Sequence, residues 1–190
     1  MIRVIGGLYK GKKLKRVSDR SVRPMPDKLK ESLFSVLQSD VKDSLCLDGF
    51  AGTGSIGIEA LSRGAKAVVF VDEFYPAIKV IRENVAKCEA EDGARIVRKE
   101  FNRAVIQLAK EGAKFDLIFL DPPYRLLEER NPLKVIKKRE VLEADGTIVL
   151  RHHFKTKFEG KFFAVQRRIE IGDDVVVFYR HVGKEKSRNK

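Results

Sequence analysis

The feature that most constrains the fold is a glycine-rich turn between a short apolar strand and a helix. Gly52, Gly54 and Gly57 follow the apolar segment 45–48 in a G-x-G-x-x-G spacing. Glycine lets the backbone turn tightly and approach a ligand without a Cβ, and the helix that follows offers free N–H groups. Asp72 lies twenty positions beyond the first of these glycines, at the end of a second predicted strand. Together these features predict a Rossmann-like site for a nucleotide cofactor.

Strand and helix patterns alternate after this turn, and the alternation predicts a parallel sheet with helices on both faces. The predicted strands span residues 45–48, 67–71, 95–98, 115–120 and 147–151. The predicted helices span residues 54–63, 75–88, 102–110 and 132–143. Segments 163–171 and 175–181 alternate in a β pattern around a Gly-Asp-Asp turn, which predicts an antiparallel hairpin. The expected fold class is therefore α/β, a Rossmann-like sheet that is mostly parallel and ends in an antiparallel hairpin.

Composition divides the chain into three parts. Residues 1–24 combine an alternating apolar pattern with glycines and lysines, and we expect a small basic β-hairpin extension. Residues 25–183 are expected to form one α/β domain that opens with a helix over residues 27–38. Residues 184–190 are polar and basic, and we expect this tail to be disordered.

The chain carries a formal net charge of +12, and such an excess favours binding to a polyanion, above all nucleic acid. The candidate phosphate contacts in the N-terminal extension are Arg3, Lys10, Lys12, Lys13 and Arg23. The alternative is an edge strand that its lysines protect against pairing, within a generally ionic surface.

Several other kinds of site find no support in the sequence. Cys46 and Cys88 are too few for a disulfide framework or a metal cluster, and we expect both to be buried and reduced. No apolar run approaches the roughly 18 residues of a membrane span, and the N-terminus lacks a signal-peptide core, so we expect a cytoplasmic protein. His152 and His153 follow the fifth strand without the ligand spacing of a metal site. We expect a surface or RNA-facing role for them, and no metal.

The fourth predicted strand ends in Asp121-Pro122-Pro123-Tyr124, at the edge where open α/β sheets bind ligands. The exocyclic amine of a base is a poor nucleophile because its lone pair is delocalised into the ring. The carboxylate of Asp121 and the carbonyl of Pro122 can accept its two N–H groups and aim the lone pair, and the prolines hold these acceptors in place. Tyr124 offers a flat face on which the base can stack. The motif predicts attack of an amino nitrogen on a methyl group, with Asp121, Pro122 and Tyr124 as catalytic residues.

Two further blocks are specific enough to suggest a family. They are Ile5-Gly6-Gly7 with Gly11-Lys12-Lys13-Leu14, and Arg23-Pro24 through Asp27 with Glu31-Ser32-Leu33-Phe34. With the glycine-rich turn and the motif at 121–124, the chain resembles the RsmD-type bacterial small-subunit ribosomal RNA guanine-N2 methyltransferases. It departs from the usual family pattern at Met25-Pro26, Lys28, Lys30, Asp72 and Glu100-Phe101.

The resemblance implies a class I methyltransferase fold with S-adenosyl-L-methionine as cofactor. The cofactor site that it implies consists of Asp48, Phe50, Gly52, Gly54, Asp72, Glu100 and Phe101. In that site Asp48 holds the ammonium group and Asp72 binds the ribose hydroxyls, while Glu100 or a neighbouring N–H contacts adenine and Phe101 offers a stacking face. The implied partner is ribosomal RNA within an assembling small subunit, and we expect a monomer.

Three alternatives stay open at this stage. The same chemistry on another amine, such as adenine N6, fits the motif at 121–124. A NAD-dependent dehydrogenase fits the glycine spacing and Asp72, although 190 residues leave little room for a second substrate domain. A non-catalytic RNA-binding or ribosome assembly factor could retain the fold, but the intact Asp121 and Tyr124 argue against it.

Overall fold

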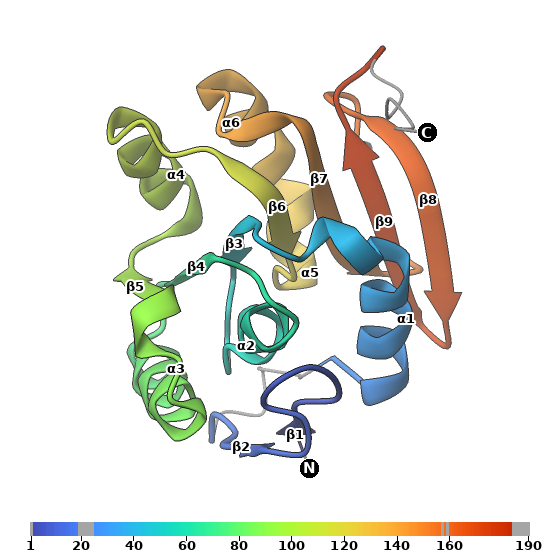
Figure 1. Ribbon diagram of the computed structural model, residues 1–190. Helices are drawn as coiled ribbons and strands as arrows, with labels where there is room; N and C mark the ends of the chain where they lie inside the picture. The colour runs from blue at the N-terminus through green and yellow to red at the C-terminus, as the bar shows by residue number, and fades with distance from the viewer. Residues whose placement is uncertain (1, 19–24, 157, 159, 184–190) are drawn as a thin grey trace.

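A seven-stranded sheet organises the molecule (Figure 1). The computed structural model describes residues 2–18, 25–156, 158 and 160–183, and describes positions 124, 125 and 128 by their backbone alone. The strand order is β5-β4-β3-β6-β7-β9-β8. These strands are β3 (Leu45–Gly49), β4 (Ala67–Asp72), β5 (Ala94–Arg98), β6 (Phe115–Leu120), β7 (Leu142–His153), β8 (Ala164–Ile171) and β9 (Asp174–Arg180). Strands β3 to β7 are parallel, and β9 pairs antiparallel with both β7 and β8.

Helices cover the sheet on both faces, as the alternation of strand and helix predicts. The helices are α1 (Asp27–Leu37), α2 (Ser55–Ser62), α3 (Tyr75–Cys88), α4 (Phe101–Lys110), α5 (Tyr124–Glu129) and α6 (Pro132–Arg139), with short turns η1 (Gln38–Asp40) and η2 (Glu91–Gly93). Helices α1, α2 and α3 lie on one face, while α4 and α6 lie on the other (Figure 1). Each face has its own core, one built around Phe34, Ile58 and Phe70, and the other around Val105 and Ile136. The predicted fold class is confirmed.

Cys46 and Cys88 are buried and free, as expected from their apolar surroundings. Within the part of the chain that the structure describes, no helix is both long and apolar enough to cross a membrane.

The predicted helix over residues 132–143 is wrong at its end. Helix α6 stops at Arg139 because Glu140 adopts a left-handed conformation with φ of 52°. Val141 and Leu142 are then drawn into the sheet, where the carbonyl of Val141 accepts a hydrogen bond from Phe115 N. Strand β7 therefore starts at Leu142, five residues before the predicted start at 147. Helix α5 was not predicted, because it is a single short segment directly after two prolines.

The N-terminal extension forms a small antiparallel hairpin of β1 (Ile2–Arg3) and β2 (Lys13–Leu14). A buried ion pair between Lys30 of α1 and Glu59 of α2, 3.3 Å apart, fixes its position. The Glu59 carboxylate also accepts hydrogen bonds from the backbone N–H groups of Ile5 and Gly6, at 2.9 and 2.8 Å. The Lys30 ammonium donates to the carbonyl of Arg3 at 2.7 Å. One buried pair therefore joins the hairpin, α1 and α2.

Glu59→Gln is expected to lower the free energy of unfolding by roughly 3–5 kcal/mol, the usual cost of removing one partner of a buried ion pair. The variant leaves the Lys30 ammonium without its counter-charge and places an amide against the N–H groups of Ile5 and Gly6. Urea unfolding measures the change. Glu83→Gln breaks the exposed pair of Glu83 with Lys15 and should change the free energy by about 1 kcal/mol or less. Equal losses in the two variants would show that the buried pair stabilises the fold no more than a surface pair.

Candidate active site

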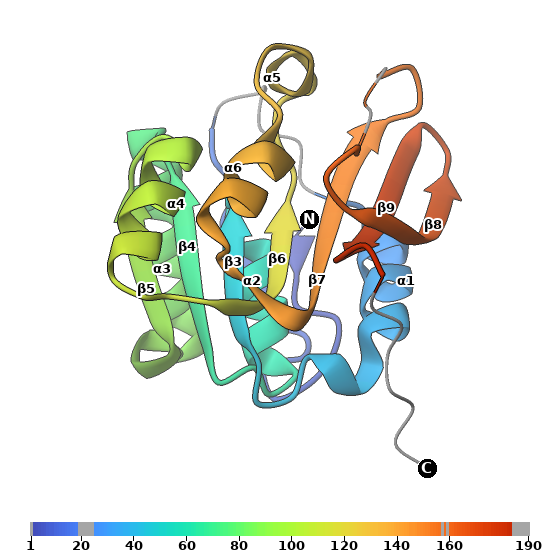
Figure 2. The same cartoon turned by 90° about the horizontal axis from the view of Figure 1, so that it is seen from above.

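Three carboxylates meet at the carboxyl edge of the sheet. Asp48 is the fourth residue of β3, Asp72 is the last residue of β4, and Asp121 directly follows β6. Since β4, β3 and β6 are adjacent and parallel, their ends lie at one edge, with α5 above it (Figure 2). This edge is the usual place for a ligand in an open α/β sheet.

The glycine-rich turn lies between these carboxylates and is hydrogen-bonded to two of them. Gly52 N donates to Asp72 Oδ2 at 2.8 Å, and Gly57 N donates to Asp48 Oδ2 at 2.9 Å. Gly54, at φ of 75°, starts α2 in the left-handed conformation, and a Cβ at Gly57 would lie 2.3 Å from the Phe70 ring. The spacing of the motif thus serves both the turn and the packing of α2 on the sheet.

Phe50 precedes the glycines and also adopts a left-handed conformation, with φ of 73°. Such a φ is costly for a bulky residue and is characteristic of functional sites. The N–H groups of Phe50 and Ala51 both donate to the carbonyl of Val71 at 3.0 Å, which holds the strained backbone against β4. The left-handed backbone of Phe50 therefore sets the direction in which the chain enters the glycine-rich turn.

Burial raises the pKa of the carboxyl groups at this edge. Asp48 is 2% exposed, and burial raises its pKa to about 7, while the hydrogen bond from Gly57 opposes the rise and the charges of Asp121 and Asp72 add to it. Burial also raises the pKa of Asp72, against the hydrogen bonds from Phe74, Gly52 and Glu73. The arrangement favours a ligand that carries positive charge, because a cation stabilises the ionised carboxylates.

Asp121 is held by a residue that the sequence did not single out. The Arg151 guanidinium in β7 donates from Nη1 to Asp121 Oδ2 at 2.8 Å. It also contacts Asp174 Oδ1, at 3.0 Å from Nε and 2.9 Å from Nη2. Arg151 directly follows the apolar run 148–150, and a charged residue at that position is the only signal in the sequence. Its partners lie far away in the sequence, so the pattern does not identify them. Pro122 is buried, and Pro123 precedes α5, whose first residue is Tyr124.

Glu100 and Phe101 lie at the start of α4, next to the same edge. Glu100 is the N-cap of α4, and its carboxylate accepts a hydrogen bond from Arg103 N at 3.0 Å. Phe101 is 3% exposed, and its ring stacks on Phe50 with centroids 4.8 Å apart. Phe50 is the more exposed ring of the pair. An adenine contact from Glu100 or Phe101 stays a prediction, and the structure places Phe101 behind Phe50.

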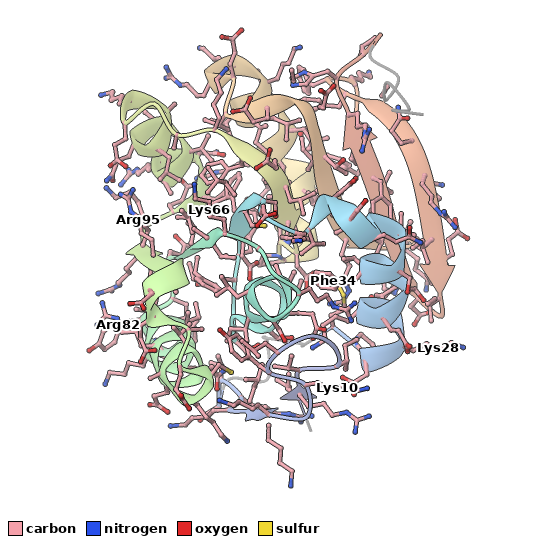
Figure 3. The ribbon with its side chains drawn as sticks, in the orientation of Figure 1. Lys10, Lys28, Phe34, Lys66, Arg82 and Arg95 are labelled. Atoms are coloured by element: carbon pink, nitrogen blue, oxygen red, sulfur yellow. The ribbon has the colours of Figure 1, made fainter. Side chains whose placement is uncertain are left out.

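The basic hairpin residues are spread along the hairpin, and Lys12 lies far from this edge. Lys12 donates to the carbonyl of Lys87 at 3.1 Å, at the far end of α3, about 20 Å from its start by helix rise. Lys13 is exposed on β2, and Lys10 lies on the hairpin loop near α2 (Figure 3). Arg3 pairs with Asp27 at 3.0 Å. Arg23 lies outside the described residues.

His152 and His153 lie at the end of β7. The expected surface position is wrong for His152, which is 6% exposed because it is folded into β7, where its Nδ1 lies 2.9 Å from the carbonyl of His153. The ring of His153 stacks on Phe154. Across the described residues, no group of three or more histidine, cysteine, aspartate or glutamate side chains could hold a metal ion.

Comparisons with known proteins indicate the family and the fold. A family model described as "Conserved hypothetical protein 95" matches residues 2–180. The chain is 41% identical over 151 residues to "Putative rRNA methyltransferase YlbH" of Bacillus subtilis, covering 80% of this chain and 82% of that protein. It is 38% identical over 149 residues to "Ribosomal RNA small subunit methyltransferase D" of Haemophilus influenzae, with coverage of 77% and 76%. The solved structure named "Putative methyltransferase yhhF from Escherichia coli" matches with a TM-score of 0.79 and 30% identity, over 95% of this chain and 97% of that chain.

Asp48→Asn is expected to stabilise the protein more at pH 8 than at pH 5. Burial raises the pKa of Asp48 from 3.8 to about 7, so between these values the native protein holds a proton that the unfolded chain has lost. The wild type therefore loses stability as the pH rises through this range, and the asparagine variant does not. The difference in free energy of unfolding should grow by on the order of 1–4 kcal/mol.

Urea unfolding at the two pH values measures this difference, and Asp145→Asn provides a control at an exposed carboxylate. A difference between Asp48→Asn and wild type that is the same at both pH values would contradict the raised pKa.

Proposed function

This chain belongs to the Conserved hypothetical protein 95 family, the RsmD-type family, and on that premise we propose that it methylates the N2 amine of a guanine in small-subunit ribosomal RNA. S-adenosylmethionine is the methyl donor. The observation that carries the proposal is the position of Asp121: a carboxylate held by Arg151, followed by two prolines, at the edge that contains the glycine-rich turn.

The residues at the edge fit this cofactor. The buried Asp48 suits its positively charged ammonium group, because burial has raised the pKa of this carboxyl group and a cation would stabilise the ionised form. In this proposal Asp48, beside the glycine-rich turn, holds the ammonium group, and Asp72, at the end of β4, binds the ribose hydroxyls. Gly52 and Gly54 let the backbone approach the methionine part, and Phe50 lies next to them. When bound, the cofactor supplies an electrophilic methyl group.

The chain's own part in the reaction is to orient the amine. The carboxylate of Asp121 and the carbonyl of Pro122 each accept one N–H of the guanine amino group, so its lone pair points along the line of transfer. The nitrogen pair forms the new N–C bond as the S–C bond breaks, and sulfur keeps that electron pair. The methylated nitrogen then loses a proton to water or to Asp121. Tyr124 supplies the stacking face in this proposal.

The substrate is expected to be unpaired RNA or RNA whose target base is flipped out, since the amine of a paired guanine is inaccessible to Asp121. Lys10 and Lys12 would contact phosphates away from the target base, because the hairpin loop and Lys12 lie near the far ends of α2 and α3. Lys13, the next residue and the first of β2, would extend this contact. A substrate that reaches both places must extend well beyond the target base, and we propose that it is a folded RNA in an assembling small subunit. We further propose that the protein acts as a monomer in the cytoplasm.

Asp121→Ala is expected to lower the rate of methyl transfer at least about 100-fold, as removal of a preorganised polar group at a reacting centre does, and to leave cofactor affinity within about twofold. The assay uses labelled S-adenosylmethionine and small-subunit particles from cells that lack their own modification, followed by digestion to nucleosides. Wild type should label N2-methylguanosine, and Asp145→Asn, an exposed carboxylate at the opposite edge, should match it.

Three outcomes would contradict this proposal. Label in N6-methyladenosine would be consistent with the proposed active site but would show that the target base is adenine and not guanine. Equal loss of cofactor binding and turnover in Asp121→Ala would overturn the role of Asp121. Cofactor binding by the wild type without transfer to any RNA would favour a non-catalytic assembly factor.

Changing Lys10, Lys12 and Lys13 together to Gln is expected to weaken RNA binding and to reduce the slope of log K against log salt by roughly 2, through loss of phosphate contacts. A matched variant changes Lys42, Lys66 and Lys114, which are exposed and precede β3, β4 and β6. It removes the same charge from the opposite edge and should change the slope little. Equal slopes for both variants would support a solvated hairpin instead of an RNA contact.

A further inference from the structure

Arg151 connects two carboxylates from different parts of the sheet, Asp121 directly after β6 and Asp174 at the start of β9. Its side chain is 6% exposed, and those of Asp121 and Asp174 are 20% and 17% exposed. Nη1 contacts Asp121 Oδ2 at 2.8 Å, while Nε and Nη2 both contact Asp174 Oδ1. The planar guanidinium therefore uses three of its nitrogens in fixed directions, which a lysine could not reproduce.

This contact makes the two oxygens of the Asp121 carboxylate different, because Arg151 binds only one of them. Oδ2 accepts the hydrogen bond from Arg151. One oxygen is therefore fixed by Arg151, while the carboxylate as a whole stays partly accessible at the carboxyl edge, with 20% of the Asp121 side chain exposed.

We propose that Arg151 is a positioning residue for methyl transfer, which holds Oδ2 of Asp121 so that Oδ1 faces the amine of the substrate. This inference rests on the proposed function, and it adds a residue and a specific oxygen to it. Asp174 is the second anchor: it holds the guanidinium from β9 and prevents it from rotating away from Asp121.

The charges around Asp121 give the arrangement a measurable signature. Burial raises the pKa of Asp121, Arg151 in β7 lowers it, and Asp174 in β9 raises it. Asp48 in β3 is a further acidic neighbour. Arg151→Gln should therefore raise the pKa of Asp121, while Asp174→Asn should lower it. A purely structural link between strands would show the same pKa shifts, but it would leave kcat per folded molecule unchanged.

The test measures methyl transfer against pH for wild type, Arg151→Gln, Arg151→Lys and Asp174→Asn, with all rates expressed per folded molecule. Arg151→Gln should lower kcat about 10- to 100-fold, since small misplacement of a reacting group has effects of this size. It should leave KM for the cofactor within about twofold and move the acid limb of the profile upward by about one pH unit. Arg151→Lys keeps the positive charge and should therefore move the acid limb upward by less than Arg151→Gln does. Asp174→Asn should move the acid limb downward.

A second readout does not depend on activity. The carboxyl pKa of Asp121, measured by carbon NMR on labelled protein, should rise in Arg151→Gln and fall in Asp174→Asn. An unchanged pKa, or folded variants with the wild-type kcat and pH profile, would overturn the positioning role. Opposite pKa shifts in a protein that methylates no RNA would support the contact and overturn the proposed function alone.

Discussion

The burial of carboxylates at one edge of the sheet is the constraint on which the rest of the site depends. Asp48 is 2% exposed, and burying a charged group costs stability unless it is hydrogen-bonded or paired. The chain supplies the partners locally: Gly57 and Gly52 donate from the glycine-rich turn, and Arg151 donates to Asp121. The turn therefore stabilises the carboxylates before any ligand arrives, and its residues are the ones proposed to bind the cofactor.

A second buried pair keeps this turn in place. Lys30 and Glu59 are both fully buried and join α1, α2 and the N-terminal hairpin on one face of the sheet. The Lys30 ammonium also donates to Ser55 Oγ at 3.3 Å, in the first residue of α2. Since α2 begins directly after Gly54, these contacts of the hairpin also help to fix the position of the glycine-rich turn. The loop of the hairpin, which carries Lys10, lies at the other end of α2, where Leu8 N donates to the carbonyl of Ser62.

The part of this architecture that depends on local sequence could be predicted. The glycine spacing and Asp72 indicate the turn, and the apolar runs indicate where the strands lie along the chain, because each requires only neighbouring residues. The end of α6 could not, since Val141 and Leu142 fit a helical pattern until they pair with β6. Nor could Arg151 be recognised as a partner of Asp121, because that contact depends on β6, β7 and β9 being adjacent. Burial of Phe101 behind Phe50 likewise depends on packing between elements distant in sequence.

The most direct test of this account is whether cofactor binding removes a proton from the buried edge. Calorimetric titration with S-adenosylhomocysteine at pH 6.5, in two buffers of different ionisation enthalpy, counts the protons released. With the pKa of Asp48 at about 7 in the free protein, an ammonium group bound beside it should release roughly 0.7 proton per site, and Asp48→Asn should release almost none. Binding without proton release in the wild type would contradict the claim that a buried carboxylate at this edge receives the positive charge of the cofactor.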